Sequence, residues 1–195
     1  FIEAYFPLRI EKYETITDSG GPGLHRGGNG LSVAYRFLVD GHIGIHDDRW
    51  LTYPWGVNGG MPGNRSTKLL VKLDGTEEFI PAKCEGVKVQ KGDLLYFNTW
   101  GGGGWGDPLE RDPANVISDV AKKLVSIDGA KRYGVVINDD LSLDEKGTKA
   151  LRSKMSKDSV KDEMFNFGGT IEEIKSRSLK ETNLEPPVSP TFLNQ

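Results

Sequence analysis

Alternating apolar and polar positions run through the first half of the chain. The clearest case is residues 31–39, where every second residue is a large apolar one. A period of two also marks residues 7–16 and returns at 42–46. Because successive side chains of a strand point to opposite faces, this pattern predicts strands that each bury one face.

Short turn sequences separate several of these segments and predict three hairpins. Glycine in such a turn accepts the backbone angles that a tight chain reversal requires. The turns are Asp40-Gly41 after residues 31–39, Asp74-Gly75 between 68–73 and 76–80, and Lys91-Gly92 between 86–90 and 93–99. Successive hairpins predict an antiparallel β-rich sandwich or open barrel.

Helical signals replace the strand pattern after residue 112. Asp112-Pro113 is a helix start, because aspartate caps free amide groups and proline fits the first turn. Val116 and Val120 then fall on one helical face. Further helices are expected after Ser126 (ending near Gly134), after Asp144 (through Leu151) and after Thr170 (171–179, with Ile171 and Ile174 inward), with a short strand at 135–137.

The sequence WGGGGWGDPLERDP at residues 100–113 stands between these two halves. Glycine is the residue that tolerates positive φ angles and the close approach of another backbone. The chain is therefore expected to divide into a β-rich region (1–99), a glycine/tryptophan joint (100–113), a short helical region (114–182) and an extended tail (183–195). The predicted fold class is α+β.

Composition narrows the classes of function. The 195 residues carry a formal net charge of −3, which argues against a general nucleic-acid binder. The apolar runs are too short to predict a membrane span. A single cysteine excludes an internal disulfide and favours a cytoplasmic location. Because the chain begins with Phe1, it is expected to be part of something longer, with any active site shared.

A glycine-rich loop at residues 18–30 carries the first candidate side chain. The loop lacks the Gly-Lys-Ser/Thr of a phosphate-binding P-loop, and a strand rather than a helix follows it. Arg26 can either fix the loop or, beside a concave array of backbone amides, bind a carboxylate or phosphate.

The segment HDDRW at residues 46–50 concentrates charged and metal-binding side chains. His42 and His46 share one strand face, but Asp47 and Asp48 point to opposite faces, so at most one aspartate joins the histidines. One interpretation is a metal site. The other is a solvated strand end in which an aspartate pairs with Arg49.

An irregular segment at residues 51–65, LTYPWGVNGGMPGNR, gathers aromatic residues among prolines and glycines. Tyr53, Trp55 and Met61 either seal the sheet or line a pocket or partner surface.

Five motifs, in this order and spacing, resemble the C-terminal portion of the hydantoinase B/5-oxoprolinase family. They are PLRIEKYETITDSGGPGLHRGGNGL, PWGVNGGMPG, GGGGWGDPLERDP, YGVVI and FGGTIEEIKSRSLKETNLEPP. That family includes the B subunits of N-methylhydantoinases and the alpha subunits of acetone carboxylases. The resemblance covers nearly the whole chain.

The resemblance implies the C-terminal segment of a B-type subunit of an ATP-dependent cyclic amide or imide hydrolase. A ketone carboxylase alpha subunit and a non-catalytic binding or assembly module are the alternatives. The expected partners are an N-terminal portion of the same subunit, an A-type ATP-binding subunit and a small-molecule substrate. ATP and a divalent metal are expected in the complete complex, none bound by this segment, which alone is expected to be inactive.

No catalytic residue and no metal ligand is assigned from the sequence. The residues expected to contact substrate or other subunits, or to shape the surface that meets them, are Arg26, Asp47, Arg49, Trp55, Asn58, Trp100 and Trp105.

Overall fold

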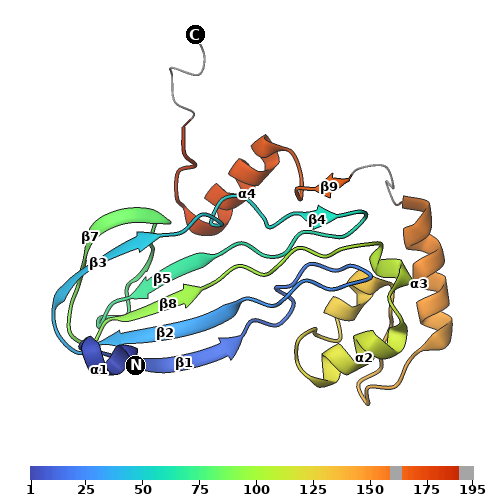
Figure 1. The fold of residues 1–195 in the computed structure, drawn as a ribbon, viewed down its shortest axis with the longest axis horizontal. Helices are drawn as coiled ribbons and strands as arrows, with labels where there is room; N and C mark the ends of the chain where they lie inside the picture. The colour runs from blue at the N-terminus through green and yellow to red at the C-terminus, as the bar shows by residue number, and fades with distance from the viewer. Residues whose placement is uncertain (159–163, 189–195) are drawn as a thin grey trace, which may run out of the picture.

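An open five-stranded antiparallel sheet forms the main layer of the computed structural model, which describes residues 1–158 and 164–188 (Figure 1). Its strand order is β1-β2-β8-β5-β6. The bounds are β1 Leu8–Thr15, β2 Leu31–Phe37, β8 Leu94–Asn98, β5 Thr67–Val71 and β6 Glu77–Phe79, with the short helix α1 Ile2–Tyr5 before β1. The predicted α+β class with antiparallel sheets is confirmed, and the main sheet is open rather than closed.

A two-stranded sheet, β3 Gly41–His46 with β7 Lys83–Val89, packs against the main sheet. Phe37 and Leu95 of the main sheet meet Ile45 and Val89 of the small sheet in one buried cluster around Leu70. Burying both apolar faces against each other removes more surface from water than a single flat sheet would.

This packing overturns two of the three predicted hairpins. The chain does turn at Asp40-Gly41 and at Lys91-Gly92, but in each case the two strands that follow one another belong to different sheets. A turn sequence specifies a reversal of the chain, not the edge to which the returning strand bonds. The third hairpin is confirmed, since β5 pairs with β6 across Gly75, which has φ of +85°.

The helical part has a hydrophobic core of its own. It contains η1 Pro108–Glu110, α2 Pro113–Ala121, η2 Gly129–Tyr133 and α3 Glu145–Asp158. The Asp112 carboxylate caps α2 by accepting from the Ala114 amide at 2.8 Å, as expected. The core residues come from α2, η2 and the segments that follow them: Val116, Val120, Val125, Ala130, Tyr133, Val135 and Ile137.

The strand expected at 135–137 is wrong. Val135 and Ile137 are buried in the helical core, and Ile137 makes only an isolated bridge to Leu143. These apolar side chains pack against the helices, and the segment does not pair with a sheet.

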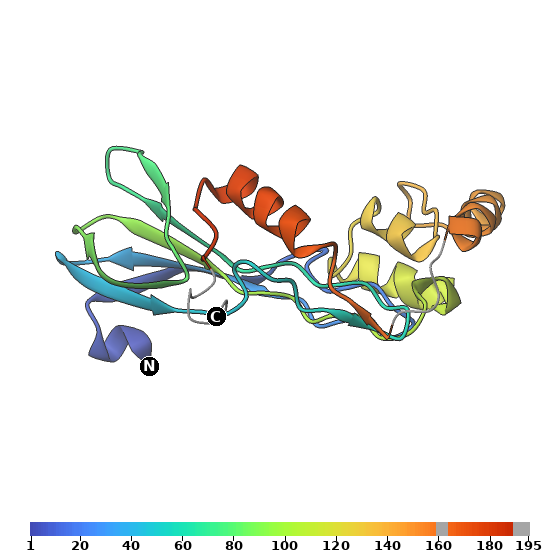
Figure 2. The same cartoon turned by 90° about the horizontal axis from the view of Figure 1, so that it is seen from above.

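The last helix, α4 Ile171–Thr182, returns to the β half and lies above the sheet (Figure 2). Thr170 caps it, and Glu173 completes a reciprocal capping box. Before it, β9 Phe165–Asn166 pairs with β4 Gly56–Val57. Ile174 is buried as expected, but Ile171 is 44% exposed. The expected division of the chain into four regions stays a prediction. Residues 189–195 of the expected extended tail lie outside the described part of the chain.

Three segments, 19–28, 56–64 and 101–106, which are irregular apart from β4, run side by side in the middle of the molecule; we call them the glycine layer (Figure 1). Backbone hydrogen bonds join them directly. The amide of Gly21 donates to Gly102 at 2.8 Å, that of Gly104 to Met61 at 2.9 Å, and that of Val57 to Gly104 at 2.9 Å. Within the segment 100–113, which was expected to be a joint, residues 101–106 are thus hydrogen-bonded to both of the other segments.

The layer is too close-packed for side chains at several positions. A Cβ atom on Gly101 would overlap the carbonyl oxygen of Ser19, and one on Gly104 would overlap that of Pro22. The absence of side chains there lets the three backbones satisfy one another's polar groups.

We expect Gly104→Ala to lower the free energy of unfolding by about 1–3 kcal/mol, because the added methyl group must push two backbones apart. Gly28→Ala is the matched control, since nothing lies within 4 Å of a Cβ at this position. Urea unfolding of the two variants measures the difference. Equal stabilities would show that the layer tolerates expansion.

Candidate functional site

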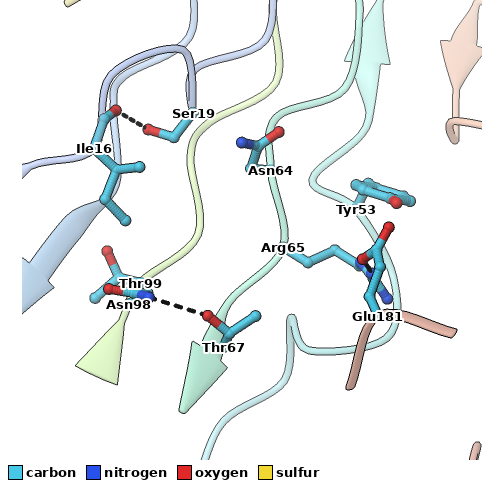
Figure 3. A pocket seen from close by; sticks show the side chains of 9 residues that line it. All are labelled: Ile16, Ser19, Tyr53, Asn64, Arg65, Thr67, Asn98, Thr99 and Glu181. Atoms are coloured by element: carbon cyan, nitrogen blue, oxygen red, sulfur yellow. Dashed lines mark hydrogen bonds and ion pairs between the residues drawn. The ribbon is translucent and has the colours of Figure 1, made fainter. Parts of the chain in front are cut away.

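Two pockets, each of about 330 Å³, lie at the two ends of α4 and share Tyr53. One is polar (Figure 3) and is lined by Ile16, Ser19, Tyr53, Asn64, Arg65, Thr67, Asn98, Thr99 and Glu181. The other is mostly apolar and is lined by Arg49, Thr52, Tyr53, Trp55, Phe167, Gly169, Ile171 and Ile174. Both volumes fall in the range of small-molecule sites.

The apolar pocket is built on aromatic side chains that remain partly exposed. Trp55 is 40% exposed, and its ring packs edge-on against Phe167, with ring centres 6.0 Å apart, and against Phe165, at 6.3 Å. The Arg49 guanidinium carbon lies 4.8 Å from the centre of the Trp55 ring. A cation over an indole beside other aromatic rings forms a surface suited to contact with a flat or apolar group.

The polar pocket is organised around an almost buried cation. The side chain of Arg65 is 4% exposed and forms an ion pair with Glu181, from the end of α4. Its guanidinium carbon lies 5.0 Å from the centre of the Tyr53 ring. Arg177 of α4 also approaches that ring and donates a hydrogen bond to the Tyr53 hydroxyl at 3.1 Å. Figure 3 shows Asn64, Thr67 and Asn98 around the same space, with Asn98 donating to Thr67 at 3.2 Å.

Of the sequence-predicted residues, Arg49 and Trp55 are brought together in the apolar pocket. Asn58, with φ of +50°, forms a tight turn with Gly59 after β4. Trp105 lies beside this turn, because its backbone forms a bridge with Val57, and its exposed ring contacts that of His25, with centres 5.5 Å apart. Trp100 is also partly exposed, just before the glycine run.

The Arg26 side chain, 15% exposed, joins the glycine loop to α2. Its guanidinium donates to the Gly27 carbonyl at 2.6 Å and to Asn29 at 2.8 Å, and its Nε lies 3.4 Å from the Asp119 carboxylate. Arg111 pairs with the same carboxylate at 2.8 Å. These contacts fix the loop; the role in anion binding stays a prediction.

Asp47 is also internal. Its side chain and that of Lys68 are both almost fully buried, and they form an ion pair that Ser66 joins through its hydroxyl. Burial lowers the pKa of Lys68 to about 8, while the adjacent carboxylate favours the charged ammonium. Of the expected pairing with Arg49, the structure shows a hydrogen bond from the Arg49 backbone amide to the Asp47 carboxylate at 3.3 Å, while Asp48 forms its ion pair with Lys83 at 2.7 Å. A contact through the Asp47 carboxylate would require this strand end to open.

The metal interpretation of the histidines finds no ligand set here. His46 is hydrogen-bonded to Glu85 at 2.5 Å. Within residues 1–158 and 164–188, no three His, Cys, Asp or Glu side chains are placed to hold one metal ion. The helices of these same residues include none with the length and apolar character needed to cross a membrane.

Sequence reasoning missed Arg65, Lys68 and Glu181. Arg65 and Glu181 are 116 residues apart, so no local spacing connects them. Lys68 is a charged residue in β5, and its buried partner Asp47 comes directly after β3, so nothing near Lys68 in the sequence indicates the pair.

The fold and the site thus define an α+β protein. It has stacked antiparallel sheets, a partly exposed aromatic surface and a polar pocket. The family model described as hydantoinase B/oxoprolinase matches residues 1–108. The chain therefore belongs to the hydantoinase B/oxoprolinase family, and the resemblance seen in the sequence motifs is confirmed.

The relatives extend this assignment. The beta chain of the caprolactamase of Pseudomonas jessenii is 36% identical over 78% of this chain and 27% of its own length. The crystal structure of the ATP-dependent caprolactamase from the same organism has a TM-score of 0.65 at 33% identity, over 77% of this chain and 27% of that one. A putative D-/L-hydantoinase component from Pseudomonas sp. (strain NS671) is 34% identical over 77% of this chain and 26% of its own length.

A nucleotide-free acetone carboxylase structure also has a TM-score of 0.65, over 92% of this chain and 28% of that one. At 22% identity it supports the fold alone. The chain spans about a quarter of the length of each of these proteins.

We expect Asp47→Asn to destabilise the protein by about 3–5 kcal/mol, because it leaves the buried Lys68 ammonium without its counter-charge. Asp48→Asn, at the neighbouring position but 80% exposed, should change stability little, because water screens its pair. The free energies of unfolding of both variants, measured in urea, test this. A mild effect of Asp47→Asn would mean that Lys68 is neutral or hydrated in the folded protein.

Proposed function

We propose that this chain is the C-terminal segment of the B-type subunit of an ATP-dependent cyclic amide or imide hydrolase. The observation that carries the proposal is the family match over residues 1–108. Two relatives bear names of this chemistry, a D-/L-hydantoinase component and an ATP-dependent caprolactamase.

The proposal includes partners and cofactors. The chain would work with the remaining portion of its own subunit and with an A-type subunit that binds ATP. A divalent metal would belong to those other portions. The segment alone would be inactive, and the complex would work in the cytoplasm.

The part of the chain in this reaction would be to provide contact surfaces. The apolar pocket offers a partly exposed indole under a guanidinium group, and such groups are frequent at the centres of protein interfaces. No catalytic side chain of this segment is proposed. The chemistry of amide activation would belong to the other parts of the complex.

The assembled complex is expected to hydrolyse ATP only when a cyclic amide or imide is present. Caprolactam, hydantoin and 5-oxoproline are the substrates to test, with phosphate release and ring opening measured together. Turnover should not depend on bicarbonate. ATP hydrolysis that requires a ketone and bicarbonate would instead identify a ketone carboxylase alpha subunit, and a lone chain that binds small molecules without any ATP-dependent turnover would identify a binding module.

Trp55→Ala is expected to weaken assembly with the partner subunits about tenfold or more, because a large apolar contact is removed from the proposed interface. Tyr13→Ala is the matched control, since this aromatic residue on β1 is 67% exposed and lies outside both pockets. Co-purification and analytical ultracentrifugation measure assembly, and circular dichroism checks the fold. Unchanged assembly of the Trp55 variant would exclude this surface as a contact.

A further inference from the structure

We propose that the polar pocket is a binding site for a small carboxylate, and that Glu181 occupies the anion position at Arg65 when no ligand is bound. Figure 3 shows the arrangement, with Arg65 reaching from the loop before β5 to Glu181 on α4.

The first support is the dependence of Arg65 on a single carboxylate. Its side chain is 4% exposed. Its guanidinium also donates to the Trp50 carbonyl at 3.3 Å and lies against the Tyr53 ring. Neither of these carries a negative charge. A guanidinium removed from water needs a counter-ion, and among the described residues Glu181 provides it.

The second support is the asymmetry of this ion pair. The Glu181 side chain is 50% exposed, although its partner is almost buried. Glu181 also lies in the last turn of α4, just before Asn183 ends the helix in the left-handed region. Its carboxylate can therefore return to water at small cost, whereas Arg65 cannot. An external carboxylate can replace Glu181 without leaving the buried charge unpaired.

The third support is the space and the polar groups around the pair. The cavity measures about 330 Å³. Thr67 and Asn98, which share a hydrogen bond, both line it, and so does Asn64 (Figure 3). The planar guanidinium fork matches the two oxygens of a carboxylate. The pocket therefore has an anchor for the charge and hydrogen-bonding groups for the rest of a short polar molecule.

Ring opening of a cyclic amide by water breaks the C–N bond and produces one carboxylate and one amine. The product of the proposed reaction would thus carry the group that this pocket recognises. This link rests on the proposed function, but carboxylate binding itself does not.

The test compares sodium butanoate with neutral butanamide as probes, using titration calorimetry and thermal shift on the intact protein with any subunits that co-purify. Ionic strength is kept constant with sodium chloride. We expect Glu181→Gln to bind butanoate at least about tenfold more tightly than the wild type, because the internal competitor is gone, and to show a larger rise in Tm. Glu185→Gln, which removes an exposed charge just beyond α4, should behave like the wild type.

Two further variants complete the design. Glu181→Asp shortens the competing side chain and should tighten butanoate binding in the same direction if the glutamine variant does not fold. Arg65→Gln in the Glu181→Gln background removes both charges and should abolish binding. Equal affinities of the Glu181 and Glu185 variants, equal binding of butanoate and butanamide, or binding that persists without Arg65 would overturn the proposal.

No ATP is needed in this experiment. A negative result therefore leaves the proposed ATP-dependent hydrolysis untouched. A failure to find that hydrolysis would leave carboxylate binding standing.

Discussion

Direct contact between backbones in the glycine layer is the constraint on which the rest of this structure depends. Three segments that are far apart in the sequence approach so closely that Gly101 and Gly104 have no room for a Cβ atom. The amide and carbonyl groups of these segments then bond to one another, so a buried irregular region carries paired polar groups. Arg26 extends this connection to the helical core through Asp119.

The layer also determines where the candidate surfaces lie. Val57 is held by Gly104, and the same loop carries Trp55 and Tyr53 on its way into the layer. β9 pairs with that loop and leads into α4. The aromatic surface and the polar pocket are thus attached to one rigid backbone arrangement, although their residues come from opposite ends of the chain.

The sequence predicts local features of this fold well and distant pairings poorly. The strand β2 and the Asp112 cap of α2 follow from neighbouring residues, and both are found where expected. The alternation did not predict that Ser32 and Ala34, on the other face of β2, are buried as well. The turn at Asp40-Gly41 was recognised, but the burial that directs β3 to a second sheet depends on β7, some 40 residues later. The sequence suggested that Asp47 lies at the surface, because no residue near it in the chain indicates its pairing with Lys68. The pairing of Arg65 with Glu181 likewise has no local signal.

Tyr53 gives a physical reason to expect that the two pockets respond together. Its ring lines both, and its hydroxyl accepts a hydrogen bond from Arg177, while Arg65 lies against its ring. α4 supplies Glu181 to the polar pocket and Ile171 and Ile174 to the apolar pocket. A shift of α4 that separates Glu181 from Arg65 would therefore also move the wall of the apolar pocket. If both pockets bind as proposed, occupation of one would change the free energy of contact at the other, since a ligand that favours one position of a packed helix biases the other surfaces built on that helix.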